Sequence, residues 1–524
     1  MHLLRHLNSA TCCFILVAFS ACSAQGRDFF LTIGGGYSPQ GNQASLEANV
    51  IFFQRLLARP EIVEADHKVY FADGFDSGRD LQVLQRRASK PAPAIKALSD
   101  IFRLSTNDAL IYRNHQVPNI AGANRADEIR DGLNALASQL AAGDRLIIYV
   151  TAHGGSAKGG KNSRDTSISG WGNKPLKMTE FSRWLDELPE QVTIVSVMAQ
   201  CYCGGFANTV FAGGDDAAGF ARNVRCGFFA QQHDLPAAGC RPDVENDEEY
   251  SSYFWGAFLG QSRTGKPVNN VDCNQDGRIS LAEAHAHAVI ASETIDIPLR
   301  SSEAVLRRFS RIAGYELEGQ SNTSSDDASN ESADDSAATE NKLAFLTGSI
   351  YEIAARGRPE ETRIIVGLAE KLDVPLSSDV TGFSQRYEQH RNEFRDLRRT
   401  SFRRPRGSSP RRKLQEAVIA KWPELEDPKG WTNTDLLSAE NQDAFLIELE
   451  EMEGYSEFLK SNEERAEARE ATTLAELKQV KFRRLMHQLE NIVLAQNIAS
   501  VASPEVVDHY RKLVAAEEGF LGSR

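Results

Sequence analysis

Two short apolar runs constrain the fold of this 524-residue chain more than any other feature. They are Leu146–Val150 and Val192–Val197, and both are largely continuous in hydrophobic character. A strand with one face in water alternates apolar with polar residues, whereas a strand covered on both faces does not. We therefore expect both runs to be strands of a parallel sheet that is buried on its two faces.

Strand and helix patterns alternate along the chain as far as Leu317. This order predicts an α/β fold with a mainly parallel sheet flanked by helices. Besides the two apolar runs, strands are expected at Phe29–Ile33 and Val69–Phe71, and helices at Leu46–Leu57 and Asp127–Leu140. An α-helical extension is expected to follow, because apolar residues recur with a helical period at 344–355, 361–372, 439–460 and 474–496.

The composition changes sharply between two parts of the chain. Residues 318–341 contain seven acidic and no basic residues among mostly small polar ones. Such a segment cannot bury enough apolar surface to fold. We expect an acidic disordered linker there, joining a domain at 27–317 to a helical region at 342–524. The net charge of −13 argues against general nucleic-acid binding.

Residues 1–24 are typical of an export signal, with the apolar stretch Cys12–Phe19 followed by small residues. The segment Ser20–Cys22 also resembles a bacterial lipoprotein processing site, which would leave a lipid anchor at Cys22. No later segment approaches the roughly 18 uninterrupted apolar residues of a spanning helix. We expect an exported protein, periplasmic or extracellular, that is soluble or anchored only at its amino end.

A histidine and a cysteine follow the two apolar runs at matching positions. His153-Gly154 comes after the first run and Cys201 after the second. Because chemistry gathers beyond the carboxyl ends of parallel strands, we expect both side chains at one edge of the sheet. Five cysteines remain after removal of the export signal, so at least one is unpaired. Two disulfides, in any of three pairings, would leave Cys201 free if they formed among Cys203, Cys226, Cys240 and Cys273.

These motifs resemble those of the caspase and legumain superfamily of cysteine peptidases. The likeness lies in Ala152–Gly154 and Ala199–Gly204, which stand where legumain-type and bacterial caspase-like sequences carry their dyad motifs. It covers roughly residues 27–317, and a His-to-Cys spacing of about 50 residues is typical of the caspase type. Two positions depart from the pattern, since Cys203 replaces the usual serine and Ala199 replaces a common acidic residue. Cys203 is therefore a rival nucleophile.

The resemblance implies a caspase-like sandwich and a cysteine endopeptidase that hydrolyses peptide bonds through a thioacyl-enzyme. Cys201 would attack the scissile carbonyl, and His153 would protonate the leaving amine and then activate water. The backbone N–H groups of Gly154 and Cys201 would form the oxyanion hole. Glycine at position 154 would keep the approach of the substrate to that amide open.

A second motif, residues 272–283, fits the calcium-loop pattern of an EF-hand. Gly277 permits the sharp turn of such a loop. The alternative is an Asp/Asn-rich loop that caps the helix beginning at Leu281. We expect Ca²⁺ either to stabilise the peptidase region or to order its substrate-side loops. The expected ligands are Asp272, Asn274, Asp276, Arg278 through its carbonyl, Ser280 directly or through water, and Glu283 through two oxygens.

Two other functions share these motifs. A non-catalytic calcium-binding interaction protein would keep the same fold without peptidase chemistry. A legumain-like transpeptidase would transfer the acyl group to an amine rather than to water. Covalent labelling of Cys201 separates the two enzymes from the binding protein, and products with an added amine separate the enzymes from each other.

Overall fold

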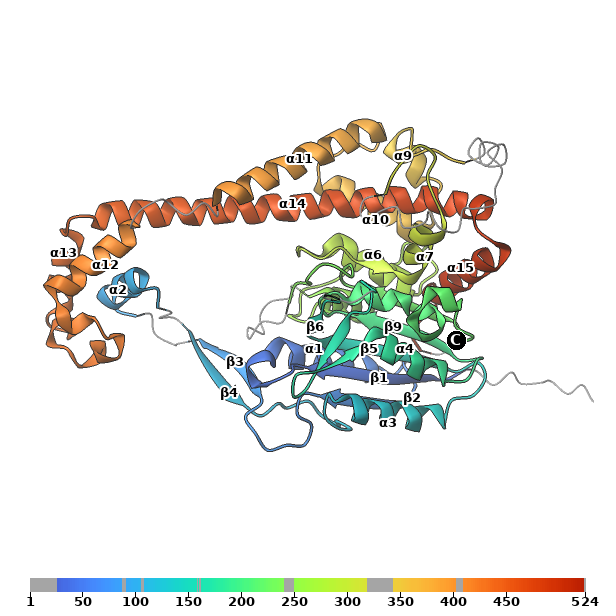
Figure 1. Cartoon of the computed structure of the whole chain (residues 1–524), viewed down its shortest axis with the longest axis horizontal. Coiled ribbons are helices and arrows are strands. Elements are labelled where there is room, and N and C mark those ends of the chain that lie inside the picture. Colours follow the sequence, from blue (N-terminus) through green and yellow to red (C-terminus); the bar gives the residue numbers. More distant parts are fainter. Residues whose placement is uncertain are drawn as a thin grey trace, which may run out of the picture.

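The structure, a computed structural model, consists of an α/β region from which long helices extend (Figure 1). The expected export signal, residues 1–24, and the expected linker, residues 318–341, lie outside the described residues, so both stay predictions. Within the described part, none of the helices combines the length and the hydropathy needed to cross a membrane. The structure describes residues 26–86, 91–104, 108–157, 159, 162–239, 249–317, 343–401 and 409–522.

A six-stranded sheet forms the centre of the α/β region. Its strands are β1 (Asp28–Gly35), β2 (Glu64–Phe71), β5 (Arg145–Ala152), β9 (Thr193–Met198), β10 (Arg225–Phe229) and β11 (Leu299–Arg300). They lie in the order β11-β10-β9-β5-β1-β2, and every neighbouring pair is parallel except β10 and β11. The two apolar runs lie in the adjacent strands β5 and β9, and every residue of β5 is buried. The prediction of an α/β fold with a mainly parallel, doubly covered sheet is confirmed.

Helices cover both faces of this sheet. They include α1 (Ala44–Leu57), α3 (Ala126–Ala137), α4 (Met178–Asp186), α5 (Tyr250–Leu259) and α6 (Leu281–Ala291). Tyr149 of β5 points to one face, where its ring centroid lies 5.4 Å from that of Trp255 in α5. Tyr70 of β2 points to the opposite face, where it lies against Gly132 of α3. The alternation of side chains along a strand places these two tyrosines on different faces.

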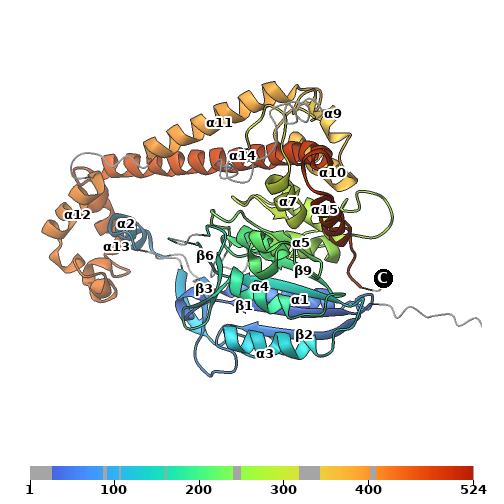
Figure 2. The same ribbon diagram turned by 45° about the vertical axis from the view of Figure 1, so that its right-hand side comes forward.

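The carboxyl-terminal helices pack directly on the α/β region. Helix α14 (Tyr455–Val501) runs along one side of that region and continues well beyond it (Figures 1 and 2). Leu489 and Val493 of α14 are fully buried in the same hydrophobic core as the central strands. The predicted helical extension is confirmed, and part of it shares its core with the sheet. The other helices that pack against α14 at this end of the molecule are α9 (Ile350–Ala354), α10 (Pro359–Lys371), α11 (Val380–Ser401) and α15 (Pro504–Glu517).

A second hydrophobic core lies at the far end of α14. The antiparallel strands β3 (Leu81–Arg86) and β4 (Asp108–Arg113) project from the α/β region towards it (Figure 1). Between them α2 (Pro93–Phe102) packs against α12 (Pro410–Lys421) and α13 (Gln442–Glu450). Two segments far apart in the sequence therefore build one small module. Its buried side chains include Leu98, Ile101, Leu414, Trp422, Phe445 and Phe458.

A buried arginine joins the carboxyl-terminal helices to the sheet. Arg300, the last residue of β11, is fully buried and lies within 4.0 Å of four carboxylates. Two of them, on Glu360 and Glu361, belong to α10, and that of Glu517 belongs to α15. The fourth belongs to Glu303 of α7 (Ser301–Phe309). Because a buried charge needs partners, this cluster fixes the position of three helices against the edge of the sheet.

The structure corrects the expected helix at 439–460. Helix α13 ends at Glu450, and the chain turns at Gly454. The φ of Gly454 is 90°, a value that favours glycine and interrupts the helix. Helix α14 then continues unbroken for 47 residues and includes the whole predicted stretch 474–496. Neither the β3–β4 hairpin nor α2 was expected, because α2 packs against helices from the distant carboxyl-terminal part of the chain.

Candidate functional site

The strand register brings His153 and Cys201 side by side. In the ladder between β5 and β9, Arg145 is paired with Thr193 and Val150 with Met198, and the offset between partners is constant along both strands. The same difference in residue number separates His153 from Cys201, which lie just beyond the carboxyl ends of β5 and β9. The predicted meeting of the two segments at one edge of the sheet is confirmed.

Gly154 lies directly against the backbone of Cys201. A Cβ atom at position 154 would come within 1.9 Å of the Cys201 carbonyl oxygen and 2.8 Å of its carbonyl carbon. Glycine is therefore required for the two turns to pack together. The sequence suggested that glycine keeps the path of the substrate open. In the structure, glycine is required because the main chain of Cys201 lies against it.

The imidazole of His153 has a partner that the sequence did not predict. Its Nε2 lies 2.9 Å from Oε1 of Gln43, in the loop after β1, and its ring contacts that of Tyr37 with centroids 5.3 Å apart. Because the amide oxygen of Gln43 accepts hydrogen bonds, Nε2 carries the proton and Nδ1 keeps the lone pair. Burial lowers the pKa of His153, so the ring is neutral at pH 7.

The thiol of Cys201 faces a different segment. Its Sγ accepts a hydrogen bond of 3.3 Å from the amide of Ala237, in the loop that follows β10. Burial raises the pKa of Cys201, the nearby carboxyl group of Asp296 adds to the effect, and the Ala237 amide opposes it. In the described residues no hydrogen bond joins the Cys201 thiol to His153. The pair is therefore arranged as a neutral thiol and a neutral imidazole.

The amide of Cys201 lies in the turn after β9. The amides of Tyr202, Cys203 and Gly204 donate to carbonyl groups, whereas that of Cys201 donates to no carbonyl among the described residues. Tyr202 has a φ of 61°, in the left-handed region, so the chain turns sharply immediately after Cys201. An amide of a candidate nucleophile that donates to no carbonyl is suited to binding a developing oxyanion.

Cys203 is poorly placed to act as the nucleophile. It is fully buried, and its Sγ accepts a hydrogen bond of 3.2 Å from the amide of Gln231. Burial raises its pKa strongly. The disulfides considered from the sequence are not formed among the described cysteines, because Cys201, Cys203, Cys226 and Cys273 are all free thiols. Cys240 lies outside the described residues.

The predicted calcium loop is folded around its own carboxylates. Asp272 accepts hydrogen bonds from the amides of Asp276 and Gly277, at 3.2 and 2.9 Å. Glu283, which is 3% exposed, turns back into the loop and accepts from the amides of Asn274 and Ser280, at 3.3 and 2.9 Å. Gly277 has a φ of 79°, as expected for the sharp turn.

The remaining expected ligands lie on the same loop. Asn274 and Asp276 bond each other through Nδ2 and Oδ2 at 3.0 Å, and Asp276 also accepts from the amide of Arg278 at 2.8 Å. Ser280 is the N-cap of α6, and its hydroxyl accepts from the amide of Glu283 at 3.1 Å. The loop therefore caps α6, as the alternative interpretation expected. Its oxygen atoms nevertheless lie close together in the single loop 272–283. A set of carboxylate, amide, hydroxyl and carbonyl oxygens fits Ca²⁺.

The calcium loop lies at the opposite edge of the sheet from His153 and Cys201. The amide of Leu281 donates to Gly519, and the next residue, Phe520, accepts from the side chain of Arg145 at 2.6 Å. Arg145 begins β5, so these contacts mark the amino ends of the strands. Helix α6 leads from the loop towards Asp296 over 11 residues, about 16 Å. The position favours a stabilising role over direct ordering of substrate-side loops.

Comparisons with known proteins name no family for this chain. No family model and no curated protein matches it. The crystal structure of protein GSU0716 from Geobacter sulfurreducens is similar over 45% of this chain and 82% of that chain, at 10% sequence identity and a TM-score of 0.27. A likeness at this level carries no argument about the site.

Proposed function

We propose that this chain is an exported cysteine endopeptidase in which Cys201 and His153 form the catalytic dyad. The observation that carries the proposal is the strand register, which places the two residues at equivalent positions beyond neighbouring parallel strands. Gly154 supports it, because its missing side chain lets the two turns pack together. The caspase-like and legumain-like resemblance of the motifs points to the same chemistry.

In this proposal each group has its own step. Cys201 Sγ attacks the peptide carbonyl and forms a thioester as the leaving amine departs. His153 takes the thiol proton on Nδ1 and gives it to that amine, while Gln43 holds Nε2 and keeps the ring oriented. The amide of Cys201 stabilises the oxyanion, and water then hydrolyses the thioester. For this sequence to begin, the thiol must leave Ala237 and face His153.

A peptide-based electrophile tests the dyad directly. A peptidyl acyloxymethyl ketone should form a thioether at Cys201 of the wild-type protein, with loss of the carboxylate leaving group, and peptide mapping identifies the labelled residue. Labelling should fall at least about 100-fold in His153→Ala, because the base is absent. Labelling at another cysteine, or undiminished labelling in His153→Ala, would exclude this dyad. Product masses with an added amine nucleophile would identify a transpeptidase.

Alkylation of Cys201 by iodoacetamide should become faster with rising pH. Because the pKa of Cys201 is raised above its ordinary value of 9.0, its thiolate fraction grows about tenfold per pH unit between pH 6 and 8. Rate constants from mass spectrometry of the Cys201 peptide measure this slope, and Cys201→Ser identifies the background. A rate that is constant from pH 6 to 8 would indicate a resting thiolate and contradict the arrangement described above.

A non-catalytic calcium-binding protein is the second candidate. It is favoured by one observation: the thiol and the imidazole have separate partners, Ala237 and Gln43, and neither group is charged at pH 7. The electrophile separates the two candidates, since a binding protein leaves Cys201 unlabelled at every pH at which the fold is intact.

We further propose that Ca²⁺ bound by Asp272, Asn274, Asp276, Arg278, Ser280 and Glu283 stabilises the fold. The ion would offset two of the three negative charges on the carboxylates of the loop. At about 10 mM Ca²⁺ and a Kd of about 10⁻⁴ to 10⁻³ M, binding should stabilise the protein by about 1.4 to 2.7 kcal/mol.

Glu283→Gln should abolish that gain in stability, because it removes the ligand that supplies two oxygens. Thermal denaturation with and without Ca²⁺ measures the effect. Glu370→Gln, a change at an exposed acid of α10, should keep the full gain. An equal gain in both variants would place the ion elsewhere.

A further inference from the structure

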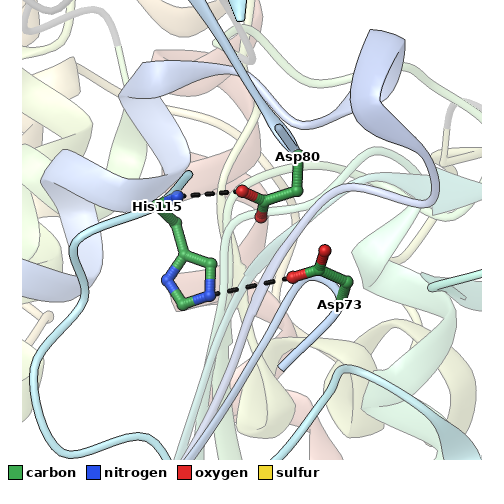
Figure 3. A group of neighbouring side chains, drawn as sticks. All are labelled: Asp73, Asp80 and His115. Carbon is green, nitrogen blue, oxygen red and sulfur yellow. Dashed lines mark hydrogen bonds and ion pairs between the residues drawn. The ribbon is translucent and has the colours of Figure 1, made fainter. Parts of the chain in front are cut away.

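Three side chains with metal-binding atoms meet beside the carboxyl end of β2 (Figure 3). Asp73 comes two residues after β2, Asp80 immediately precedes β3, and His115 comes two residues after β4. One ligand atom from each residue lies within 4.8 Å of the other two. No sequence pattern predicts this cluster, because its members are separated by loops and belong to no short motif.

The cluster is buried and incompletely hydrogen-bonded. Asp73 is 4% exposed, and its Oδ1 has no hydrogen-bond partner among the described residues. This atom points at Nε2 of His115, 3.8 Å away (Figure 3). Burial and the charge of Asp80 raise the pKa of Asp73 to about 6. A cation bound between two buried carboxylates would relieve their mutual repulsion.

The other two residues are held in place by the chain around them. Asp80 accepts from the amide of His115 at 2.8 Å and from the side chain of Asn42 at 3.1 Å. Nε2 of His115 lies 3.0 Å from the carbonyl oxygen of Gly74. That separation is a hydrogen-bond distance, and it also equals that of two ligand atoms at right angles on an octahedral metal with bonds of about 2.1 Å.

We propose that Asp73, Asp80 and His115, with the carbonyl of Gly74, bind a divalent transition-metal ion of the Zn²⁺ or Mn²⁺ class. One imidazole nitrogen among oxygen donors suits these ions, whereas Ca²⁺ prefers oxygen donors alone. In the metal-bound site Nε2 of His115 would be the ligand, and the proton of the neutral ring would lie on Nδ1. The exposed residues 75–79 lie between Asp73 and Asp80 and give the ion a path to the site.

The ion would also stiffen the loop that holds His153. Asn42 bonds Asp80 through its amide nitrogen and the amide of Gly36 through its oxygen, at 3.1 and 3.0 Å. The next residue, Gln43, bonds His153. A metal held by Asp80 would thus restrict the loop after β1. The binding site itself does not depend on the proposed peptidase activity.

Calorimetric titration of the mature full-length protein with Zn²⁺ or Mn²⁺ tests this proposal. The titration is made in the Glu283→Gln background, so that the calcium loop does not contribute. One ion should bind per chain, and its affinity should fall at least about tenfold in both Asp73→Asn and His115→Gln. Asp76→Asn, a change at an exposed neighbour paired with Arg125, should bind as its parent does. Absence of binding, or equal affinity in all four proteins, would overturn the proposal.

A second measurement needs no variant. Crystals of the wild-type protein soaked in Zn²⁺ should give an anomalous difference peak between Asp73, Asp80 and His115. With Co²⁺ in place of Zn²⁺, the absorption spectrum should lack a thiolate charge-transfer band. A peak elsewhere, no peak, or a thiolate band that assigns the ion to a cysteine would each contradict the site.

Discussion

Replacing Arg300 with alanine is expected to lower the free energy of unfolding by about 3 to 5 kcal/mol, because it leaves buried carboxylates without their cation. Arg300 is fully buried, and it faces Glu303, Glu360, Glu361 and Glu517. Its loss would release α10 and α15 from the edge of the sheet. Denaturation by urea, followed by circular dichroism, measures the change.

An exposed arginine provides the control for this prediction. Arg412 pairs with Glu416 one helical turn away on α12, and both side chains are more than half exposed. Arg412→Ala should change the free energy of unfolding by no more than about 0.5 kcal/mol. If Arg300→Ala were as stable as Arg412→Ala, the cluster would not hold the carboxyl-terminal helices in place.

Replacing Gly154 with alanine is expected to lower peptide cleavage by at least about 100-fold, because a displacement of about 1 Å between reacting groups is enough for a loss of this size. The new Cβ would stand 1.9 Å from the carbonyl oxygen of Cys201, so the turns after β5 and β9 would have to move apart. Because the neighbour is main chain, no side-chain rotation relieves the clash. Steady-state rates on a peptide substrate give the value.

Gly382→Ala is the matched control for the change at Gly154. A Cβ at Gly382, in α11, would meet no atom within 4 Å. Alanine there should keep full activity and stabilise the helix by up to about 1 kcal/mol. Full activity in Gly154→Ala would show that the close packing of the two turns is unnecessary for catalysis.

The main elements of the sheet could be predicted from the sequence because their signals are local. The hydrophobic runs at Leu146–Val150 and Val192–Val197 predicted buried strands, and the positions of His153 and Cys201 just beyond them placed both residues at one edge. Parallel neighbours with a fixed register then require the two to meet. The calcium motif was also local, since all its donors lie within the single loop 272–283.

The partners of the dyad could not be predicted in this way. Gln43 and Ala237 reach the site from loops after β1 and β10, and no local pattern specifies where such loops cross. The same is true of the Asp73, Asp80 and His115 cluster, whose members meet only after the β3–β4 hairpin has formed.

The packing between distant parts of the chain could not be predicted from the sequence either. The shared core of the sheet and α14 joins segments that the sequence divides at its acidic stretch, residues 318–341. Helical periodicity identified the carboxyl-terminal helices, but it carries no information on the surface they cover. The cluster around Arg300 could not be predicted either, because the carboxylate partners come from three separate helices.

Cleavage of a broad peptide library tests whether the protein is a peptidase that uses Cys201. The mature protein and Cys201→Ala are incubated with the library, with and without Ca²⁺ and at pH values up to about 9, where more thiolate is present. Mass spectrometry then identifies the products. The wild-type protein should cleave a defined set of bonds, and Cys201→Ala should give none of these products. The same products from both proteins, or no cleavage by the wild-type protein at any pH, would contradict a Cys201 peptidase.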